Sequence, residues 1–186
     1  MTSFKFGSLQ PDGTDAEHRY PDHYEWERTT GPVRLVVAPK GSHVDLLIAL
    51  TGCWRGPFWI LYVLSVPRTG ALPGRYQSPE PLGQADVATF LSTHRSFLEG
   101  DARHALWVAS ASAEGTLVYD RHNVLYAYGP IEMFEAVLQA HGIRRGPVEL
   151  PVPHSHHYHD SHDVAETKLL GALDWIYSPL QEGDED

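Results

Sequence analysis

Three apolar runs stand out in the first half of the chain and set the first expectations about the fold. They cover Val33–Ala38, Val44–Leu50 and Phe58–Val66, and residues rich in Gly and Pro separate them. Their β-branched and aromatic content favours strands, and the short separations favour an antiparallel meander. Because each run is continuous rather than alternating, we expect the sheet to be covered on both faces.

Three segments with apolar residues at helical spacing predict helices. The first covers residues 84–99, where apolar positions recur at intervals of three and four residues. The second begins at Pro130 and ends at Gly142, which suits the preference of Pro for the start of a helix and of Gly for its end. The third begins at Asp163 and runs to about Tyr177. We expect these helices to pack against the sheet.

Shorter apolar segments between the helices predict further strands. Residues 105–109 form one strand, residues 116–119 and 124–128 form a hairpin, and residues 148–152 alternate apolar and polar positions. Residues 69–83 hold several Pro and Gly and predict a long loop. The expected fold is therefore α+β, with a mostly antiparallel sheet of about six to seven strands and three helices packed against it.

We expect three regions along the chain: an irregular N-terminal arm over residues 1–32, one α+β domain over 33–180 and an acidic tail over 181–186. The start of the chain lacks an apolar stretch of signal-peptide length. The most apolar run, Phe58–Val66, has about half of the roughly 20 residues that a membrane-spanning helix needs. We therefore expect a soluble, cytoplasmic protein.

The charge balance narrows the classes of partner. The chain has 14 Lys and Arg residues and 24 Asp and Glu residues, which gives a formal net charge of −10 at pH 7. Binding to nucleic acid or to an anionic membrane needs the opposite sign, so we expect neither partner. The same charge would steer the protein toward a basic partner protein. Twelve His residues make the net charge unusually sensitive to pH near 6.

Signatures of common enzyme classes are absent from the sequence. The chain contains no GxSxG elbow, no GxxxxGKS/T phosphate loop and no GxGxxG turn. Cys53 is the only cysteine, which excludes an intramolecular disulfide and favours a reducing compartment. We interpret Cys53 as an inert buried thiol, the alternative being a nucleophile whose pKa is lowered by the nearby Arg55.

The strongest chemical signal is a histidine-rich segment, residues 154–163, which holds five imidazoles and two carboxylates. Imidazole nitrogen and carboxylate oxygen are ligands for zinc, nickel, copper and iron. In an extended stretch His157 and His159 point to the same side, and His159 and His162 come close where the chain begins to turn. The predicted ligands are His156, His157, His159 and His162, assisted by Asp160 and Asp163, and zinc is the expected metal.

The same segment has a purely structural interpretation. Its imidazoles would then line a solvated loop, while Asp163 and Glu166 form a capping box at the start of the following helix. His122 lies in the turn of the predicted hairpin, where we expect it to be solvated. Its alternative role is to complete the metal site, which requires the hairpin tip to fold back on the histidine-rich segment.

Two functional hypotheses follow. The first is an acidic interaction module, such as an inhibitor or immunity-type protein that binds a basic partner, for which the charge and the aromatic content are the grounds. The second is a metal-binding protein or metal-dependent hydrolase that uses residues 154–163. Imidazole rings that converge on one point would favour the second hypothesis.

Overall fold

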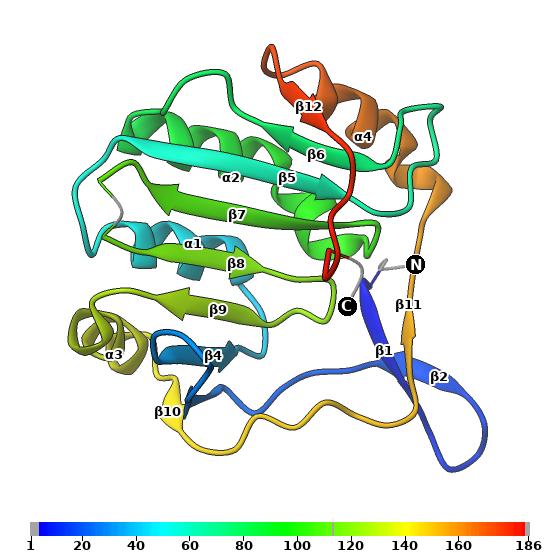
Figure 1. Cartoon of the computed structure of the whole chain (residues 1–186). Helices are drawn as coiled ribbons and strands as arrows, with labels where there is room; N and C mark the ends of the chain where they lie inside the picture. The colour runs from blue at the N-terminus through cyan, green and yellow to red at the C-terminus, as the bar shows by residue number, and fades with distance from the viewer. Residues whose placement is uncertain (1–3, 113, 185–186) are drawn as a thin grey trace.

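A nine-stranded sheet forms the centre of the molecule (Figure 1). The computed structural model describes residues 4–112 and 114–184. In spatial order the strands are β10 (Arg144–Arg145), β3 (His23–Glu27), β4 (Arg34–Ala38), β9 (Leu125–Tyr128), β8 (Thr116–Tyr119), β7 (His104–Ser110), β5 (Phe58–Leu64), β6 (Gly74–Gln77) and β12 (Ile176–Ser178). Neighbouring strands run antiparallel, except that β10 and β3 are parallel.

Four α-helices accompany this sheet in the described part of the chain. They are α1 (His43–Thr51), α2 (Gln84–Gly100), α3 (Ile131–Ala140) and α4 (Asp163–Leu170), the last preceded by a short 3-10 turn, η1 (Asp160–His162). In Figure 1, α1 and α2 lie behind the sheet, and side chains from both layers form the major core. The fold is therefore α+β, with more strands and one more helix than the sequence predicted.

Side chains alternate between the two faces of the central strands. In β7, Leu106 and Val108 are fully buried in the major core, whereas Trp107 between them is partly exposed on the other side. The same alternation continues in β8 and β9. We call the side of the sheet away from α1 and α2 the open face. Its partly exposed aromatic side chains are Trp59, Trp107, Tyr126 and Tyr128.

A second, three-stranded sheet lies against part of the open face. Its antiparallel strands are, in order, β11 (His154–His156), β1 (Phe6–Leu9) and β2 (Asp15–Glu17). Phe6 and Tyr20 pack with Val36, Ala38 and Val124 in a minor core. Strand β4 is therefore buried on both faces, as its continuous apolar pattern predicted.

The apolar run Val44–Leu50, expected to be a strand, forms most of helix α1. Four of its seven residues are Leu or Ala, which favour helices, so a continuous apolar run was a poor guide to strand structure here. Leu46, Leu47 and Leu50 are buried in the major core. The expected meander is also wrong, because β9, β8 and β7 lie between β4 and β5.

Segments expected to be irregular contain strands. Within residues 1–32 the structure has β1, β2 and β3, and within residues 69–83 it has β6. Such short strands depend on the neighbour with which they pair more than on their own sequence pattern. The strand expected over residues 148–152 does not form, and the chain enters β11 only at His154. Residues 1–3 of the predicted arm lie outside the described residues.

The third helix is shorter than predicted. It ends at Leu170, and strand β12 follows where we expected helix up to Tyr177. After β12 the chain crosses the open face and reaches the turn at residues 181–184 (Figure 1). Residues 185–186 of the predicted acidic tail lie outside the described residues. Among the described helices, none combines the length and the apolar character needed to cross a membrane.

A buried ion-pair network holds α4 and the histidine-rich segment against the main sheet. The fully buried Arg103 donates to both carboxylate oxygens of Asp101, and to Glu166 at 2.7 Å. Arg103 also donates to the backbone carbonyl of His159. The predicted capping box is wrong, because Asp163 and Glu166 bind groups on other elements instead of the first N–H groups of their own helix.

Candidate metal centre

Three imidazoles meet where the small sheet touches the end of the main sheet. His122, His154 and His156 each offer one ring nitrogen, and these three nitrogens lie within 4.8 Å of one another. The ring centroids of His122 and His156 are 4.8 Å apart, and those of the other two pairs are 5.4 Å apart. We call these residues the histidine trio. Within the residues that the structure describes, it is the one cluster of His, Cys, Asp and Glu with this spacing.

Two members of the trio share a face because side chains alternate along β11. His154 and His156 are two positions apart, while Ser155 between them donates a hydrogen bond to Asp15. Strand β1 pairs with β11 and places Phe6 opposite His156. The centroid of the fully buried Phe6 ring lies 5.4, 5.4 and 5.7 Å from the centroids of His122, His154 and His156, so one apolar ring contacts the whole trio.

His122 comes from the turn between β8 and β9. One carboxylate oxygen of Asp120 accepts the backbone N–H groups of His122 and Val124, and Tyr20 donates a hydrogen bond to the carbonyl of His122 at 3.1 Å. The other oxygen of Asp120 lies 2.8 Å from Nδ1 of His122. An ionised carboxylate only accepts hydrogen bonds, so Nδ1 is the donor. The lone pair of the neutral ring is therefore on Nε2.

The other two imidazoles are held in a similar way. Nδ1 of His154 lies 3.0 Å from the carbonyl oxygen of Pro151, so Nδ1 donates and the lone pair is on Nε2. Nε2 of His156 is buried and has no hydrogen-bond partner among the described residues. Burial, reinforced by the nearby His122 and Arg121, lowers the pKa of His156 to about 4. His156 is therefore neutral at pH 7, which is the form that binds metals.

Two of the ligands predicted from the sequence face other groups. Nε2 of His157 lies 2.8 Å from a carboxylate oxygen of Asp15. Nε2 of His159 lies 2.9 Å from the backbone carbonyl oxygen of Phe4. Both imidazoles are thus positioned by contacts with the N-terminal part of the chain, away from the trio.

The other predicted ligands lie close to the buried ion-pair network. Nδ1 of His162 is 3.5 Å from Asp101, and burial lowers the pKa of His162. Asp160 and Asp163 both bind Arg68. Of the six predicted residues, only His156 belongs to the trio.

His154 is not among the ligands predicted from the sequence, and His122 was expected to be solvated. The side chain of His122 is instead only 12 % exposed, because the hairpin tip folds back on β11. The sequence contained an indication that His122 could be a ligand. Asp120 precedes His122 by two residues in the turn, and a carboxylate often orients a ligating imidazole. His154 is two positions from His156. In a strand that begins at residue 154, these two side chains therefore point to the same face.

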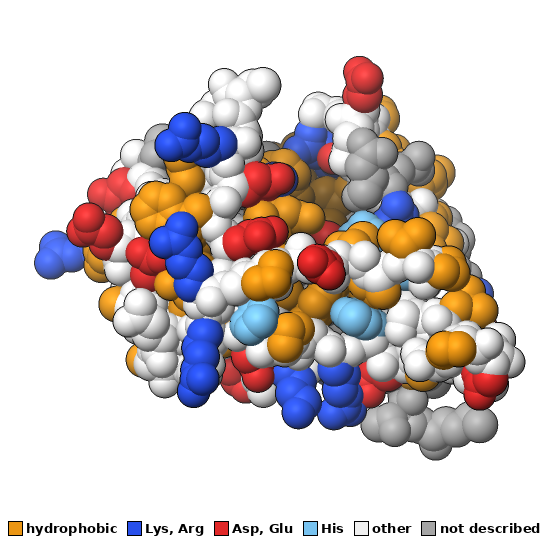
Figure 2. All heavy atoms as spheres, turned by 90° about the horizontal axis from the view of Figure 1, so that it is seen from below, with side chains coloured by type: hydrophobic (Ala, Val, Ile, Leu, Met, Phe, Trp, Pro, Cys, Tyr) orange, Lys and Arg blue, Asp and Glu red, His pale blue; other side chains and the backbone are white. Residues whose placement is uncertain are grey.

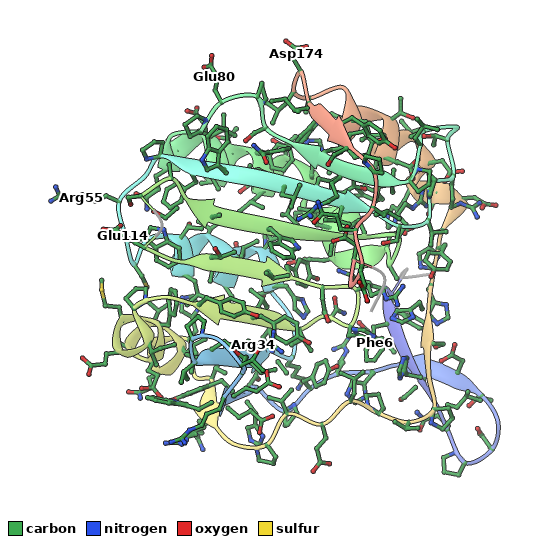
Figure 3. All side chains as sticks on the ribbon, viewed as in Figure 1. Phe6, Arg34, Arg55, Glu80, Glu114 and Asp174 are labelled. Atoms are coloured by element: carbon green, nitrogen blue, oxygen red, sulfur yellow. The ribbon has the colours of Figure 1, made fainter. Side chains whose placement is uncertain are left out.

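Cys53 has the properties of the inert thiol that we expected. It is buried in the major core, and burial raises the pKa of its thiol. Arg55 is exposed and points away from the body of the molecule (Figure 3). The nucleophile alternative therefore has no support from the surroundings of Cys53.

A groove with a volume of about 350 Å³ begins beside the trio and runs along the open face. His122 and Asp120 line one end of it, so the trio and the groove share His122. Its floor is made of apolar and aromatic side chains: Val63, Ala105, Trp107, Val118, Tyr126 and Tyr128. The view from below in Figure 2 shows the open face along its upper edge, hollowed and with hydrophobic atoms in its depth.

Comparisons with known proteins do not identify a family for this chain. No protein-family model matches it, and neither a curated protein nor a solved structure shows significant similarity. The chemistry of the trio and of the groove is therefore the basis for any statement about function.

Proposed function

We propose that this protein binds one divalent transition-metal ion, zinc in the first place, through His122, His154 and His156. The main support for the proposal is that one nitrogen from each of three imidazoles lies within 4.8 Å of the other two. Three histidines are a known ligand set for zinc, and neutral imidazole also suits copper, nickel and iron. The proposal keeps the metal hypothesis drawn from the sequence and revises its ligands.

The surroundings of the trio support this proposal because they fix the ring orientations before any metal arrives. Asp120 and the Pro151 carbonyl each accept a hydrogen bond from the Nδ1–H of one imidazole. Histidines that bind a metal usually donate such a hydrogen bond from the ring nitrogen that does not bind the metal. The unpartnered, buried Nε2 of His156 is a polar atom whose burial costs free energy unless something binds it. A bound cation would satisfy that atom.

Elemental analysis and zinc titration of the tag-free full chain test the proposal. We expect one zinc per chain, and we expect His122→Gln or His156→Gln to weaken zinc binding by at least about 100-fold, since even changes to supporting residues cost about 10–100-fold. His159→Gln and the exposed His141→Gln serve as matched controls and should leave the affinity unchanged. Metal-free protein that binds no zinc, or zinc binding that survives His122→Gln, contradicts the proposal.

Docking to a basic partner protein is the second candidate function. The observation that favours it is the set of partly exposed aromatic side chains on the open face, where Glu25 and Glu27 of β3 add negative charge. Purification from the native host should then recover an equimolar basic protein whose binding weakens as salt is raised. A clean monomer at low salt counts against this candidate.

A further inference from the structure

From the junction of the trio and the groove we infer that the proposed metal centre is the anchoring end of a ligand site for a small organic acid with an aromatic body. The carboxylate would bind the metal, and the ring would lie on the floor of the groove. This inference rests on the proposed metal-binding function and deepens it by naming the ligand class.

The metal end of the site follows from the number of protein ligands. Three imidazoles leave at least one position open on a four-coordinate ion, and carboxylate oxygen is a common fourth ligand. Among the trio, His122 lines the groove directly, and its partner Asp120 lines the same end. A ligand that enters along the groove would therefore reach the trio on the side of His122.

The floor of the groove fits an aromatic ring. Register pairs Trp107 with Val118 and Val118 with Tyr126, so these side chains form a continuous row across β7, β8 and β9. All three side chains are partly exposed and line the groove, and the guanidinium groups of Arg34 and Arg75 lie over the rings of Tyr126 and Trp107. The volume of about 350 Å³ lies near the small end of the range for small-molecule sites, which suits one or two fused rings.

A carboxylate of the protein itself already lies in the groove. Asp184, whose side chain is 6 % exposed, lines the groove and lies 3.8 Å from the guanidinium group of Arg75. Arg34 also lines the groove and binds Tyr128 and Glu27 (Figure 3). The anion of Asp120 is balanced by the metal when it is bound. The groove therefore holds carboxylate groups even though the net charge of the chain is negative.

Cobalt(II) in place of zinc gives a visible spectrum that reports on its ligands, so the full chain loaded with one cobalt is the test system. The probes are 2-naphthoate and the uncharged 2-naphthamide, which has the same ring but lacks the carboxylate. We expect naphthoate to change the cobalt absorption in a saturable way, and naphthamide to leave it unchanged. The metal-free protein should bind naphthoate at least tenfold more weakly.

Two tryptophan variants locate the ring. Trp107→Ala removes part of the groove floor and should weaken naphthoate binding at least tenfold. Trp59→Ala removes the same side chain from the same face, outside the groove, and should change the affinity less than twofold. Cobalt loading and the unfolding midpoint of both variants show whether either has lost its fold.

The outcomes separate the two proposals. A chain that binds no cobalt contradicts the metal function and this inference together. A chain that binds cobalt with a spectrum unaffected by naphthoate, or equally affected by naphthamide, contradicts this inference alone. Equal losses in Trp107→Ala and Trp59→Ala contradict the placement of the ring in the groove.

Discussion

At the scale of single residues, the candidate metal site depends on which nitrogen of each imidazole carries the proton. Asp120 and the Pro151 carbonyl accept from Nδ1 of His122 and His154, so in both rings Nε2 has the lone pair that can bind a metal. An imidazole in the other tautomer would present an N–H group instead of a lone pair. The carboxylate of Asp120 is therefore as important to the account as the ligands themselves.

Asp120→Asn tests this dependence with a minimal change. The amide oxygen of Asn still accepts the backbone N–H groups of the turn, but its NH₂ group donates to Nδ1 and moves the imidazole proton to Nε2. We expect zinc affinity to fall by about 10–100-fold with little change in stability. Zinc titration measures this, and Asp12→Asn, in another turn of the same type, is the control. Equal zinc affinity in both variants would refute the tautomer argument.

The buried Lys5 leads to a prediction about pH. Burial lowers the pKa of Lys5 from 10.5 to about 7, while its ammonium group lies over the Tyr119 ring and donates to the carbonyl of Leu98. The charged and titratable groups around it are Asp120, Asp101, Glu99, His43 and His104. A lowered pKa means that the folded state disfavours the proton, at a cost of about 1.4 kcal/mol per unit.

The stability that the buried Lys5 ammonium group costs is fully lost below pH 7, where the folded and the unfolded states both carry the proton. This loss of stability disappears as the pH rises to 10.5. Between these values the folded state has lost the proton and the unfolded state has kept it, so stability rises with pH. We expect the free energy of unfolding to rise more steeply from pH 7 to 10 in the wild type than in Lys5→Met. Urea unfolding across this range measures the slopes, with the exposed Lys40→Met as control. Equal slopes of unfolding free energy against pH for the wild type and Lys5→Met would contradict this prediction.

At the scale of elements, β11 shows how far the sequence can lead. The helix over residues 84–99 and the hairpin over 116–128 could be predicted, because their patterns are local and complete within the segment. Strand β11 could not, because its start is fixed by pairing with β1, almost 150 residues away. The register of that pairing decides which face of β11 meets the hairpin tip, and this explains why His156 belongs to the trio and the other predicted ligands do not.

Gly7 in β1 connects this pairing to the metal site. A Cβ atom at this position would lie 2.5 Å from Asp15 Oδ1 and 2.6 Å from Ser155 Oγ, which is too close. We expect Gly7→Ala to displace the Asp15 and Ser155 side chains, which are hydrogen-bonded to each other, and through Ser155 to disturb β11. Zinc affinity should fall about tenfold or more, since ligand geometry is sensitive to small displacements. Hydrogen exchange in β1 and β11 should also become faster.

Gly41→Ala is the matched control for Gly7→Ala, because a Cβ atom there meets nothing within 4 Å. Zinc affinity and hydrogen exchange in this variant should equal those of the wild type. If Gly7→Ala also binds zinc like the wild type, the small sheet does not position the trio.

At the scale of the whole molecule, the buried ion-pair network ties α4 and the histidine-rich segment to the main sheet. Arg103, Asp101 and Glu166 are all fully buried, and they join β7 to α4. The histidine-rich segment lies between these anchors, with the His159 carbonyl and N–H bound to Arg103 and Asp101. No local sequence pattern predicts such a network, because its members are up to 65 positions apart and each is an ordinary charged residue by itself.

Removing the cation of this network should destabilise the protein strongly. Arg103→Met leaves two buried carboxylates without their guanidinium partner, which typically costs about 3–5 kcal/mol. Urea unfolding measures this loss. Arg95→Met, which breaks the exposed ion pair with Asp45, should cost less than about 1 kcal/mol. An equally small loss of stability in Arg103→Met and in Arg95→Met would show that the network adds little to stability.

The most direct test of the metal site is anomalous diffraction at the zinc edge from crystals of the full chain grown with one equivalent of zinc. The proposed site requires one peak per chain, with zinc–nitrogen distances of about 2.0–2.1 Å to His122, His154 and His156. A peak at His157, His159 or His162 instead, or no ordered zinc, would contradict it.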